Sequence, residues 1–178
     1  KFGELNQQLK QATEQTAKLR DTTEYLQRAL SNTRVRGQWG ERMAEDVLQT
    51  VGLLENINYT KQETSKTGSR PDYTFYLPKN KKINMDVKFP LDNYLRFVEE
   101  QDPARKDGFQ QQFLRDVRNR IKEVSGRNYI NPEENTLDYM LIFIPNERIY
   151  EFMLEVDDKL MDEALQQRVV LCSPLTLY

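Results

Sequence analysis

The sequence predicts an α/β domain, a mixed sheet flanked by helices, preceded by an N-terminal coiled-coil helix. Three observations support this fold class. Residues 1 to 33 repeat apolar side chains at alternating steps of three and four. Residues 70 to 89 alternate in polarity as half-buried strands do, and strand-like and helix-like patterns alternate further along the chain. We therefore divide the chain into a coiled-coil helical arm, 1–34, and a globular domain, 35–178.

The arm carries a seam of apolar and small residues that continues without a proline. The seam consists of Phe2, Leu5, Leu9, Ala12, Thr16, Leu19, Thr23, Leu26, Leu30 and Thr33. Because threonine and alanine occupy several of these positions, the seam is only moderately apolar. We expect it to pair chains into a homo-oligomer, and the alternative is a lone helix that folds against its own domain.

Residues 37 to 48 predict an amphipathic helix. Its apolar face repeats every fourth residue, at Trp39, Met43, Val47 and Val51. Glu41 falls on the rim of this face, from which it could reach a site at the edge of a sheet; the alternative is a glutamate that complements the helix dipole. Gly37 and Gly40 fall within the buried arc, where we expect them to let the helix approach a sheet closely.

The next two segments predict a hairpin that gathers charged residues on one face. Alternation within residues 70–77 and 81–89 places Asp72, Asp86 and Lys88 on the same side. Pairing about the turn sets Asp72 opposite Asp86 or Lys88, with Cβ atoms about 5 Å apart, or about 7–8 Å on a diagonal. We infer that this face is open to solvent and holds a metal site. The alternative is a surface Asp–Lys pair, which is common and contributes little to stability.

The types of residue restrict the metal chemistry. The chain contains no histidine and one cysteine, so carboxylates must hold any metal ion. Magnesium, or manganese in its place, prefers such oxygen ligands. The predicted ligands are Asp72, Asp86 and Glu41, and Lys88 would assist the attacking water in hydrolysis of a phosphodiester.

The remaining segments complete the α/β pattern. A strand at 57–62 and a polar loop at 63–69 precede the hairpin, and strands and helices follow at 109–124 (helix), 137–144 (buried strand), 148–156 and 158–167 (helices) and 169–172 (strand). Cys172 lies in the last strand and reads as a small core residue rather than a nucleophile. A single cysteine cannot form an intrachain disulfide, which suits a reducing cytosol.

Charge is distributed unevenly although the net charge is only −2. Residues 105–127 hold seven basic against three acidic residues, a net charge of +4, and residues 131–167 hold two against ten, a net charge of −8. One basic side would suit a DNA backbone; the alternative is that the basic residues make local pairs. The candidate DNA contacts are Arg36, Arg70, Lys79, Lys82, Arg118, Lys122 and Arg127.

Several short motifs, in order, resemble the RmuC family of bacterial DNA recombination proteins over residues 35–178. They are Gly37-x-Trp39-Gly40-Glu41, Tyr59-x-x-Gln62, Arg70-Pro71-Asp72, Asp86-x-Lys88-x-Pro90-Leu91, Phe143-Ile144-Pro145-Asn146-Glu147 and Arg168-Val169-Val170-Leu171-x-Ser173-Pro174. The resemblance implies a restriction-endonuclease-like core with the signature PD-(D/E)xK. Pro71-Asp72 and Asp86-Val87-Lys88 match that signature, and Glu41 matches the glutamate that such cores often bring from the preceding helix.

The sequence thus predicts a magnesium-dependent deoxyribonuclease domain, with Gln62 as a further member of its catalytic site. The leading alternative is a catalytically idle nuclease-like fold that serves as a coiled-coil scaffold and binds DNA or protein. A third reading is a structural oligomer. We expect a cytoplasmic fragment truncated at both ends, without membrane contact of its own, and the resemblance implies that an inner-membrane anchor could lie upstream.

Overall fold

The structure is a computed structural model that describes residues 32–65 and 68–177. Nearly all of the predicted coiled-coil arm lies outside the described residues, so its pairing stays a prediction. Residues from Gly37 onward form one compact unit, and the description below concerns that unit.

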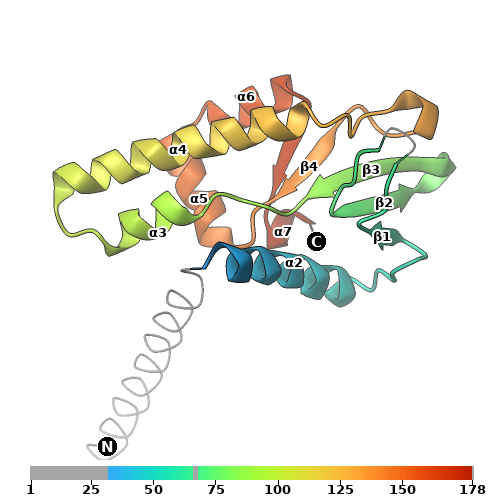
Figure 1. Cartoon of the computed structure of the whole chain (residues 1–178), viewed down its shortest axis with the longest axis horizontal. Coiled ribbons are helices and arrows are strands. Elements are labelled where there is room, and N and C mark those ends of the chain that lie inside the picture. Colours follow the sequence, from blue (N-terminus) through green and yellow to red (C-terminus); the bar gives the residue numbers. More distant parts are fainter. Residues whose placement is uncertain (1–31, 66–67, 178) are drawn as a thin grey trace, which may run out of the picture. The chain divides into compact units, whose positions relative to one another are not determined.

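A five-stranded mixed sheet organises this unit (Figure 1). Its strands follow the order of the chain: β1 (Tyr59–Lys61), β2 (Tyr73–Leu77), β3 (Lys81–Asp86), β4 (Met140–Phe143) and β5 (Val169–Cys172). The first three strands pair antiparallel, and β3, β4 and β5 pair parallel. The predicted mixed sheet flanked by helices is therefore confirmed.

Helices cover both faces of the sheet. They are α2 (Thr33–Thr50), α3 (Asp92–Glu99), α4 (Pro103–Ser125), α5 (Glu147–Val156), α6 (Leu160–Gln166) and α7 (Pro174–Leu177), with short 3-10 turns at Pro78–Asn80 and Pro132–Glu134. On one face α4, α5 and α6 pack on β4 and β5. On the other face, the part of α2 from Gly37 on packs against β1, β2 and β3 (Figure 1).

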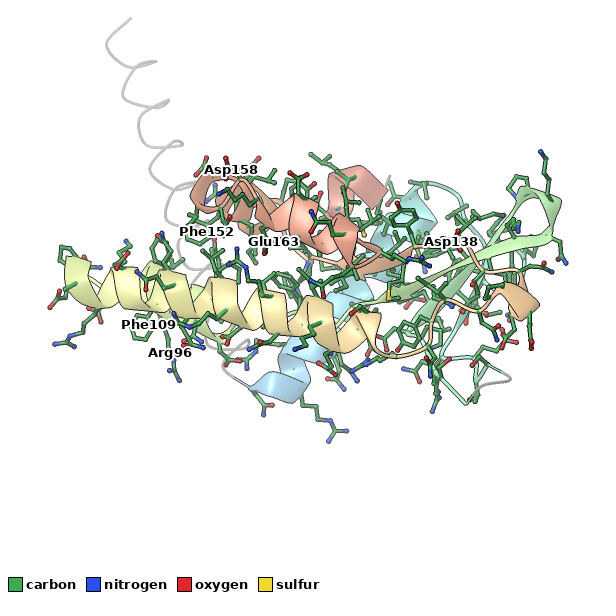
Figure 2. The ribbon with its side chains drawn as sticks, turned by 90° about the horizontal axis from the view of Figure 1, so that it is seen from above. Arg96, Phe109, Asp138, Phe152, Asp158 and Glu163 are labelled. Atoms are coloured by element: carbon green, nitrogen blue, oxygen red, sulfur yellow. The ribbon has the colours of Figure 1, made fainter. Side chains whose placement is uncertain are left out.

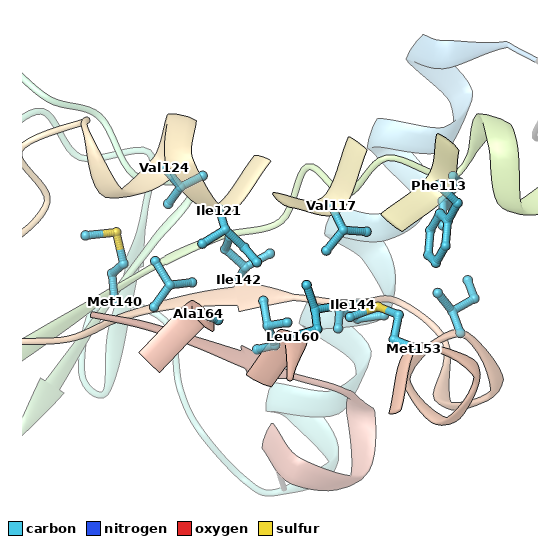
Figure 3. Packing of buried hydrophobic residues seen from close by; sticks show 14 of the residues in the cluster. Phe113, Val117, Ile121, Val124, Met140, Ile142, Ile144, Met153, Leu160 and Ala164 are labelled. Carbon is cyan, nitrogen blue, oxygen red and sulfur yellow. The ribbon is translucent and has the colours of Figure 1, made fainter. Parts of the chain in front are cut away.

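The larger core lies between α4 and the parallel strands (Figure 3). Helix α4 contributes Phe113, Val117, Ile121 and Val124, all at most 1% exposed. These residues recur every three or four positions, so they form one stripe along the helix. Asp102 begins the helix by accepting a hydrogen bond from the backbone N–H of Ala104 at 2.9 Å.

The smaller core forms beneath the antiparallel strands. Tyr59, Tyr73 and Met85 come from three adjacent strands, and α2 adds Ala44 and Leu48. This arrangement confirms that the apolar faces of the predicted hairpin join one core. Neighbouring residues of a strand point to opposite faces, so Phe143 and Cys172 also reach this core while the residues before them, Ile142 and Leu171, reach the other.

The two glycines of α2 have different surroundings. A Cβ atom on Gly40 would lie 3.3 Å from Cγ1 of Val87 and 3.6 Å from its carbonyl oxygen, whereas a Cβ atom on Gly37 would meet nothing within 4 Å. The expected close approach of helix and sheet is therefore confirmed for Gly40 and wrong for Gly37.

The other predicted elements are observed, with α4 beginning at Pro103 instead of residue 109 and β1 limited to Tyr59–Lys61. Burial raises the pKa of the Cys172 thiol to about 12, as expected for a core residue rather than a nucleophile. We did not predict α3, which is only eight residues long and begins two residues after Pro90. No helix within residues 32–65 and 68–177 is both long and apolar enough to cross a membrane.

Candidate active site

The hairpin register sets the two predicted metal ligands across from each other. Tyr73 pairs with Met85 in the antiparallel ladder between β2 and β3. Asp72 precedes Tyr73 and Asp86 follows Met85, so the register continued by one residue places the two aspartates opposite each other. Of the two partners that the sequence left open for Asp72, the register selects Asp86 over Lys88.

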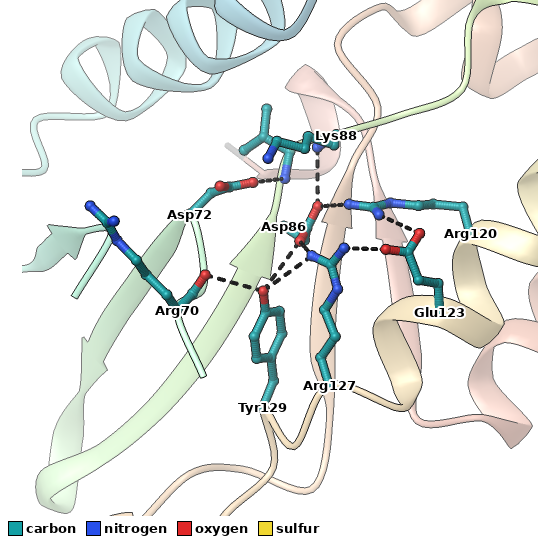
Figure 4. A network of polar contacts seen from close by, with 9 residues as sticks. Arg70, Asp72, Asp86, Lys88, Arg120, Glu123, Arg127 and Tyr129 are labelled. Atoms are coloured by element: carbon teal, nitrogen blue, oxygen red, sulfur yellow. Dashed lines mark hydrogen bonds and ion pairs between the residues drawn. The ribbon is translucent and has the colours of Figure 1, made fainter. Parts of the chain in front are cut away.

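Asp86 lies at the centre of a network of polar contacts (Figure 4). Its Oδ1 accepts hydrogen bonds from Arg120 Nη2 and, at 3.1 Å, from the backbone N–H of Lys88. Its Oδ2 accepts from Arg127 Nη1 at 2.6 Å and from the Tyr129 hydroxyl at 3.4 Å. Both carboxylate oxygens therefore have two donors each.

The inference that this face of the hairpin is open is wrong at Asp86, which is only 1% exposed. Arg120 from α4, and Arg127 and Tyr129 from the segment after it, cover the carboxylate. Two rungs further along the ladder, on the same face, Thr74 donates a hydrogen bond to Asn84 at 2.7 Å, and both residues are also buried. A buried carboxylate requires such charged partners, because an isolated charge is costly to remove from water.

Asp72 has a different environment. Its Oδ2 accepts one hydrogen bond, from the backbone N–H of Val87 at 2.9 Å. Burial is the main cause that raises the pKa of Asp72; the hydrogen bond from Val87 lowers it, and the charge of Asp86 raises it further. The charges of Lys88 and Arg120 act in the opposite direction. Asp72 is thus a carboxylate that a nearby cation would stabilise.

Glu41 lies within electrostatic reach of the hairpin. The hydroxyl of Tyr73 donates to the backbone carbonyl of Glu41 at 3.1 Å and ties α2 to β2. Burial raises the pKa of the Glu41 carboxyl, the charge of Asp72 raises it further, and the charges of Lys88 and Lys61 lower it. The structure therefore brings Glu41, Asp72, Asp86 and Lys88 into one electrostatic neighbourhood.

Lys88 and Gln62 flank this group. The side chain of Lys88 is exposed, just past the end of β3. The backbone N–H of Gln62 donates to the carbonyl of Asp72 at 3.0 Å, but its side-chain Oε1 accepts from Arg70 Nη2, also at 3.0 Å. The backbone of Gln62 thus lies beside Asp72, while its side chain is engaged with Arg70.

The predicted DNA contacts divide into two groups. Arg70, Lys79 and Lys122 have exposed side chains, and Nζ of half-buried Lys82 lies 5.7 Å from the ring centre of Tyr76. Arg36, in the first turn of α2, is buried, only 8% exposed. Arg118 and Arg127 instead make ion pairs within the domain.

The basic segment and the acidic segment meet each other. Arg118 of α4 pairs with Asp157 at 2.6 Å and with Glu163 of α6 at 2.7 Å. Figure 2 shows Glu163 and Asp158 on the segment beside α4. These partners of Arg118 lie 39 and 45 residues away in the sequence, so they are not the local pairs that we had left as the alternative. Local pairs are observed instead for Arg120 and Arg127, which both pair with Glu123.

Sequence reasoning missed Arg120, Glu123 and Tyr129. A signal for Arg120 was present in the sequence. At about 100° per residue, Arg120 lies roughly 20° from Phe113 on the helical wheel, at the edge of the buried stripe. An arginine in that position requires a buried acidic partner, and Asp86 supplies it.

The donor set fits a hard cation in its chemistry, with one condition. Asp72 and Asp86 are like charges across one rung, and the charge of Asp86 contributes to the raised pKa of Asp72; a divalent ion would relieve this repulsion. The ion would have to compete with two guanidinium groups for Asp86. Among the described residues no group of three or more His, Cys, Asp or Glu side chains is close enough together to hold a metal ion.

The last two motifs of the sequence analysis, at residues 143–147 and 168–174, contact each other. Ser173, which is fully buried, donates its hydroxyl hydrogen to Oε1 of Glu147 at 2.9 Å. Glu147 begins α5, the helix that follows β4, and Ser173 immediately follows β5, so this bond joins the segments that follow two parallel strands. We assign these motifs a role in holding the fold.

Comparisons with known proteins give one consistent family. The RmuC family model matches residues 1–178. The chain is 30% identical to the "DNA recombination protein RmuC homolog" of Pseudomonas aeruginosa, over 97% of this chain and 39% of that protein. It is 34% identical to the "DNA recombination protein RmuC" of Escherichia coli K12, over 85% of this chain and 33% of that protein. The chain thus spans about two fifths or less of the length of these relatives, and no solved structure matches it.

Proposed function

Because this chain belongs to the RmuC family, we propose that its globular domain hydrolyses DNA phosphodiesters with a divalent metal ion. The names of the relatives support DNA as the substrate and recombination as the process in which the domain acts. The residues contribute the chemistry: carboxylates for a hard cation beside a lysine. The observation that carries the proposal is the register of the hairpin, which sets Asp72 across from Asp86 with Lys88 two residues further on.

Each residue of the site has a proposed role. Asp72 and Asp86 would hold magnesium or manganese, and Glu41 would complete or tune that site. When bound, the metal would neutralise charge on the phosphoryl oxygens and lower the pKa of water. Lys88, whose side chain is exposed, would orient the attacking water or take its proton at Nζ. Gln62 holds the chain beside Asp72 through its backbone hydrogen bond.

The experiment is cleavage of labelled duplex, single-stranded and forked DNA in magnesium or manganese. We expect the wild type to cut at least one substrate and expect Asp72→Asn and Lys88→Met to lose that cutting. Asp158→Asn and Lys159→Met make the same changes at exposed positions and should cut normally. Cutting that survives in both Asp72→Asn and Lys88→Met would show that the activity lies elsewhere.

A second candidate function is supported by the arginines. Asp86 is neutralised by Arg120 and Arg127, as in a site that serves the fold rather than catalysis. On this reading the domain is a catalytically idle scaffold that binds DNA or protein. A folded wild type that binds DNA equally well with magnesium and with EDTA, and cuts none of the three substrates, would favour the scaffold.

A further inference from the structure

Glu123 closes the solvent side of the arginine pair. Its Oε2 accepts from Arg120 Nη1 at 2.7 Å, and its Oε1 accepts from Arg127 Nη2 (Figure 4). The side chain of Glu123 is 53% exposed, whereas that of Asp86, on the other side of the same two guanidinium groups, is 2% exposed. The two arginines thus lie between one buried and one exposed carboxylate.

The two contacts differ in how easily they could be replaced. The pairs with Asp86 are buried, and breaking them would leave uncompensated charge inside the domain. The pairs with Glu123 lie at the surface, where such contacts contribute little to stability. An oxyanion from solvent could therefore displace Glu123 while Asp86 keeps both guanidinium groups in position.

Arg120 also has an unused donor. Its side chain is 10% exposed, and its Nε is a buried nitrogen without a hydrogen-bond partner among the described residues. A buried donor without a partner costs free energy, so its presence marks a place where hydrogen bonding is incomplete. Guanidinium forks match the geometry of phosphate oxygens, often through two parallel hydrogen bonds.

We propose that Arg120 and Arg127 form a binding site for a backbone phosphate of DNA, and that Glu123 occupies this site in the free protein. The choice of DNA rests on the proposed function; the residues themselves require an oxyanion. Because both arginines also contact Asp86, the bound phosphate lies next to the proposed metal ligands. The site therefore positions the strand, and Glu123 weakens binding by competing with the phosphate.

The test measures binding of a fluorescein-labelled single-stranded oligodeoxynucleotide by anisotropy, in EDTA, at several salt concentrations. Glu123→Gln should bind several-fold more tightly than the wild type. Its affinity should also fall more steeply with salt, by up to about 0.7 in the log–log slope, since one more phosphate is contacted. Arg127→Lys keeps a positive charge beside Asp86 but lacks the fork, and should bind more weakly than the wild type.

Glu163→Gln is the matched control. Glu163 is a 39% exposed carboxylate paired with another arginine of the same helix, Arg118, so its replacement makes the same change in net charge. Equal gains from Glu123→Gln and Glu163→Gln would overturn the inference, because net charge alone would then explain them. An affinity and a salt slope unchanged in Glu123→Gln would also overturn it, whether or not the wild type binds. Melting temperatures confirm that each variant is folded.

Binding in EDTA separates this site from the nuclease proposal. If Glu123→Gln binds more tightly but the wild type cuts no DNA in magnesium, the proposed phosphate site is supported and the proposed hydrolysis is contradicted. If the wild type cuts DNA but Glu123→Gln and Glu163→Gln have the same affinity for DNA, the proposed hydrolysis is supported and the proposed phosphate site is contradicted.

Discussion

Asp86 has two roles with conflicting requirements, one as a proposed metal ligand and one as the buried partner of two arginines. As a proposed metal ligand it needs a free pair of electrons directed at the ion, yet both of its oxygens accept hydrogen bonds from arginines. The arginines make its burial tolerable, because their positive charges offset the charge of a carboxylate whose side chain is only 2% exposed. The residue is therefore structural in the free protein, whatever it does with a metal bound.

This role changes what a substitution of Asp86 measures. Asp86→Ala removes the common partner of Arg120 and Arg127, and removal of one member of a buried ion pair costs about 3–5 kcal/mol. We expect a loss of that order in the free energy of unfolding, measured by urea denaturation. Asp158→Ala, at an exposed position, should cost less than about 0.5 kcal/mol. An Asp86→Ala domain as stable as the wild type would contradict the network described here.

The environment of Asp72 can be tested through the pH dependence of the free energy of unfolding. Its pKa is raised by burial and by Asp86, so the folded domain holds this proton more tightly than the unfolded chain does. Ionisation of Asp72 therefore lowers stability as the pH rises above the ordinary aspartate value of about 3.9 and through the folded pKa. Asp72→Asn removes this cost, and its side-chain oxygen can still accept from Val87.

We expect Asp72→Asn to be more stable than the wild type at pH 7 without divalent metal. The gain should shrink as the pH falls through the folded pKa of Asp72 and should vanish below about pH 3.9, where the carboxyl is protonated in both states. Urea denaturation across this range measures it. A difference that does not change with pH would contradict the assigned cause of the pKa shift.

At the scale of elements, the approach of α2 to β3 positions Glu41. Gly40 precedes Glu41, and a Cβ atom on Gly40 would lie 3.3 Å from Cγ1 of Val87, whose N–H donates to Asp72. The absence of a side chain at Gly40 thus sets the separation between the helix that carries one carboxylate and the strand that positions another.

We therefore expect Gly40→Leu to destabilise the domain by about 1–3 kcal/mol, as overpacking does, and to impair any metal-dependent activity. Gly37→Ala is the control: its Cβ would meet nothing within 4 Å, and alanine is favoured over glycine inside a helix by about 0.5–1 kcal/mol. Thermal denaturation measures both variants. If Gly40→Leu were as stable as Gly37→Ala, the close contact would not matter.

The hairpin shows what the sequence could predict. Because the strand period is two, alternating apolar residues determined which face each aspartate occupies, and the observed register agrees. The covering of that face was not predictable in the same way. It depends on where Arg120, Arg127 and Tyr129 arrive from 34 to 43 residues away in the sequence. Local periodicity contains no information about such a contact, although the place of Arg120 beside the apolar stripe indicated that some acidic partner was needed.

At the scale of the whole molecule, the domain is part of a larger protein family. The matched region makes up only 39% and 33% of the length of the two relatives, so the activity, substrates and partners of a complete protein remain proposals. The predicted coiled coil at 1–34 is the part of this chain that would set the oligomeric state.

We expect the chain to sediment as a homo-oligomer because of that seam. Replacing Leu19 and Leu26 together by aspartate places charges within it and should shift sedimentation to the monomer. Replacing Gln27 and Lys18, which lie outside the seam, by aspartate is the control. A wild type that sediments as a monomer at micromolar concentration would favour the lone helix instead.

We propose that Asp72 and Asp86 hold a divalent cation although two arginines already contact Asp86. Isothermal titration of manganese into the wild type, Asp72→Asn and Asp158→Asn tests this most directly, since it needs neither DNA nor turnover. We predict that the wild type and Asp158→Asn take up manganese at one site and that Asp72→Asn loses it. A folded wild type that takes up no manganese, or an Asp72→Asn variant that binds it unchanged, would contradict the claim.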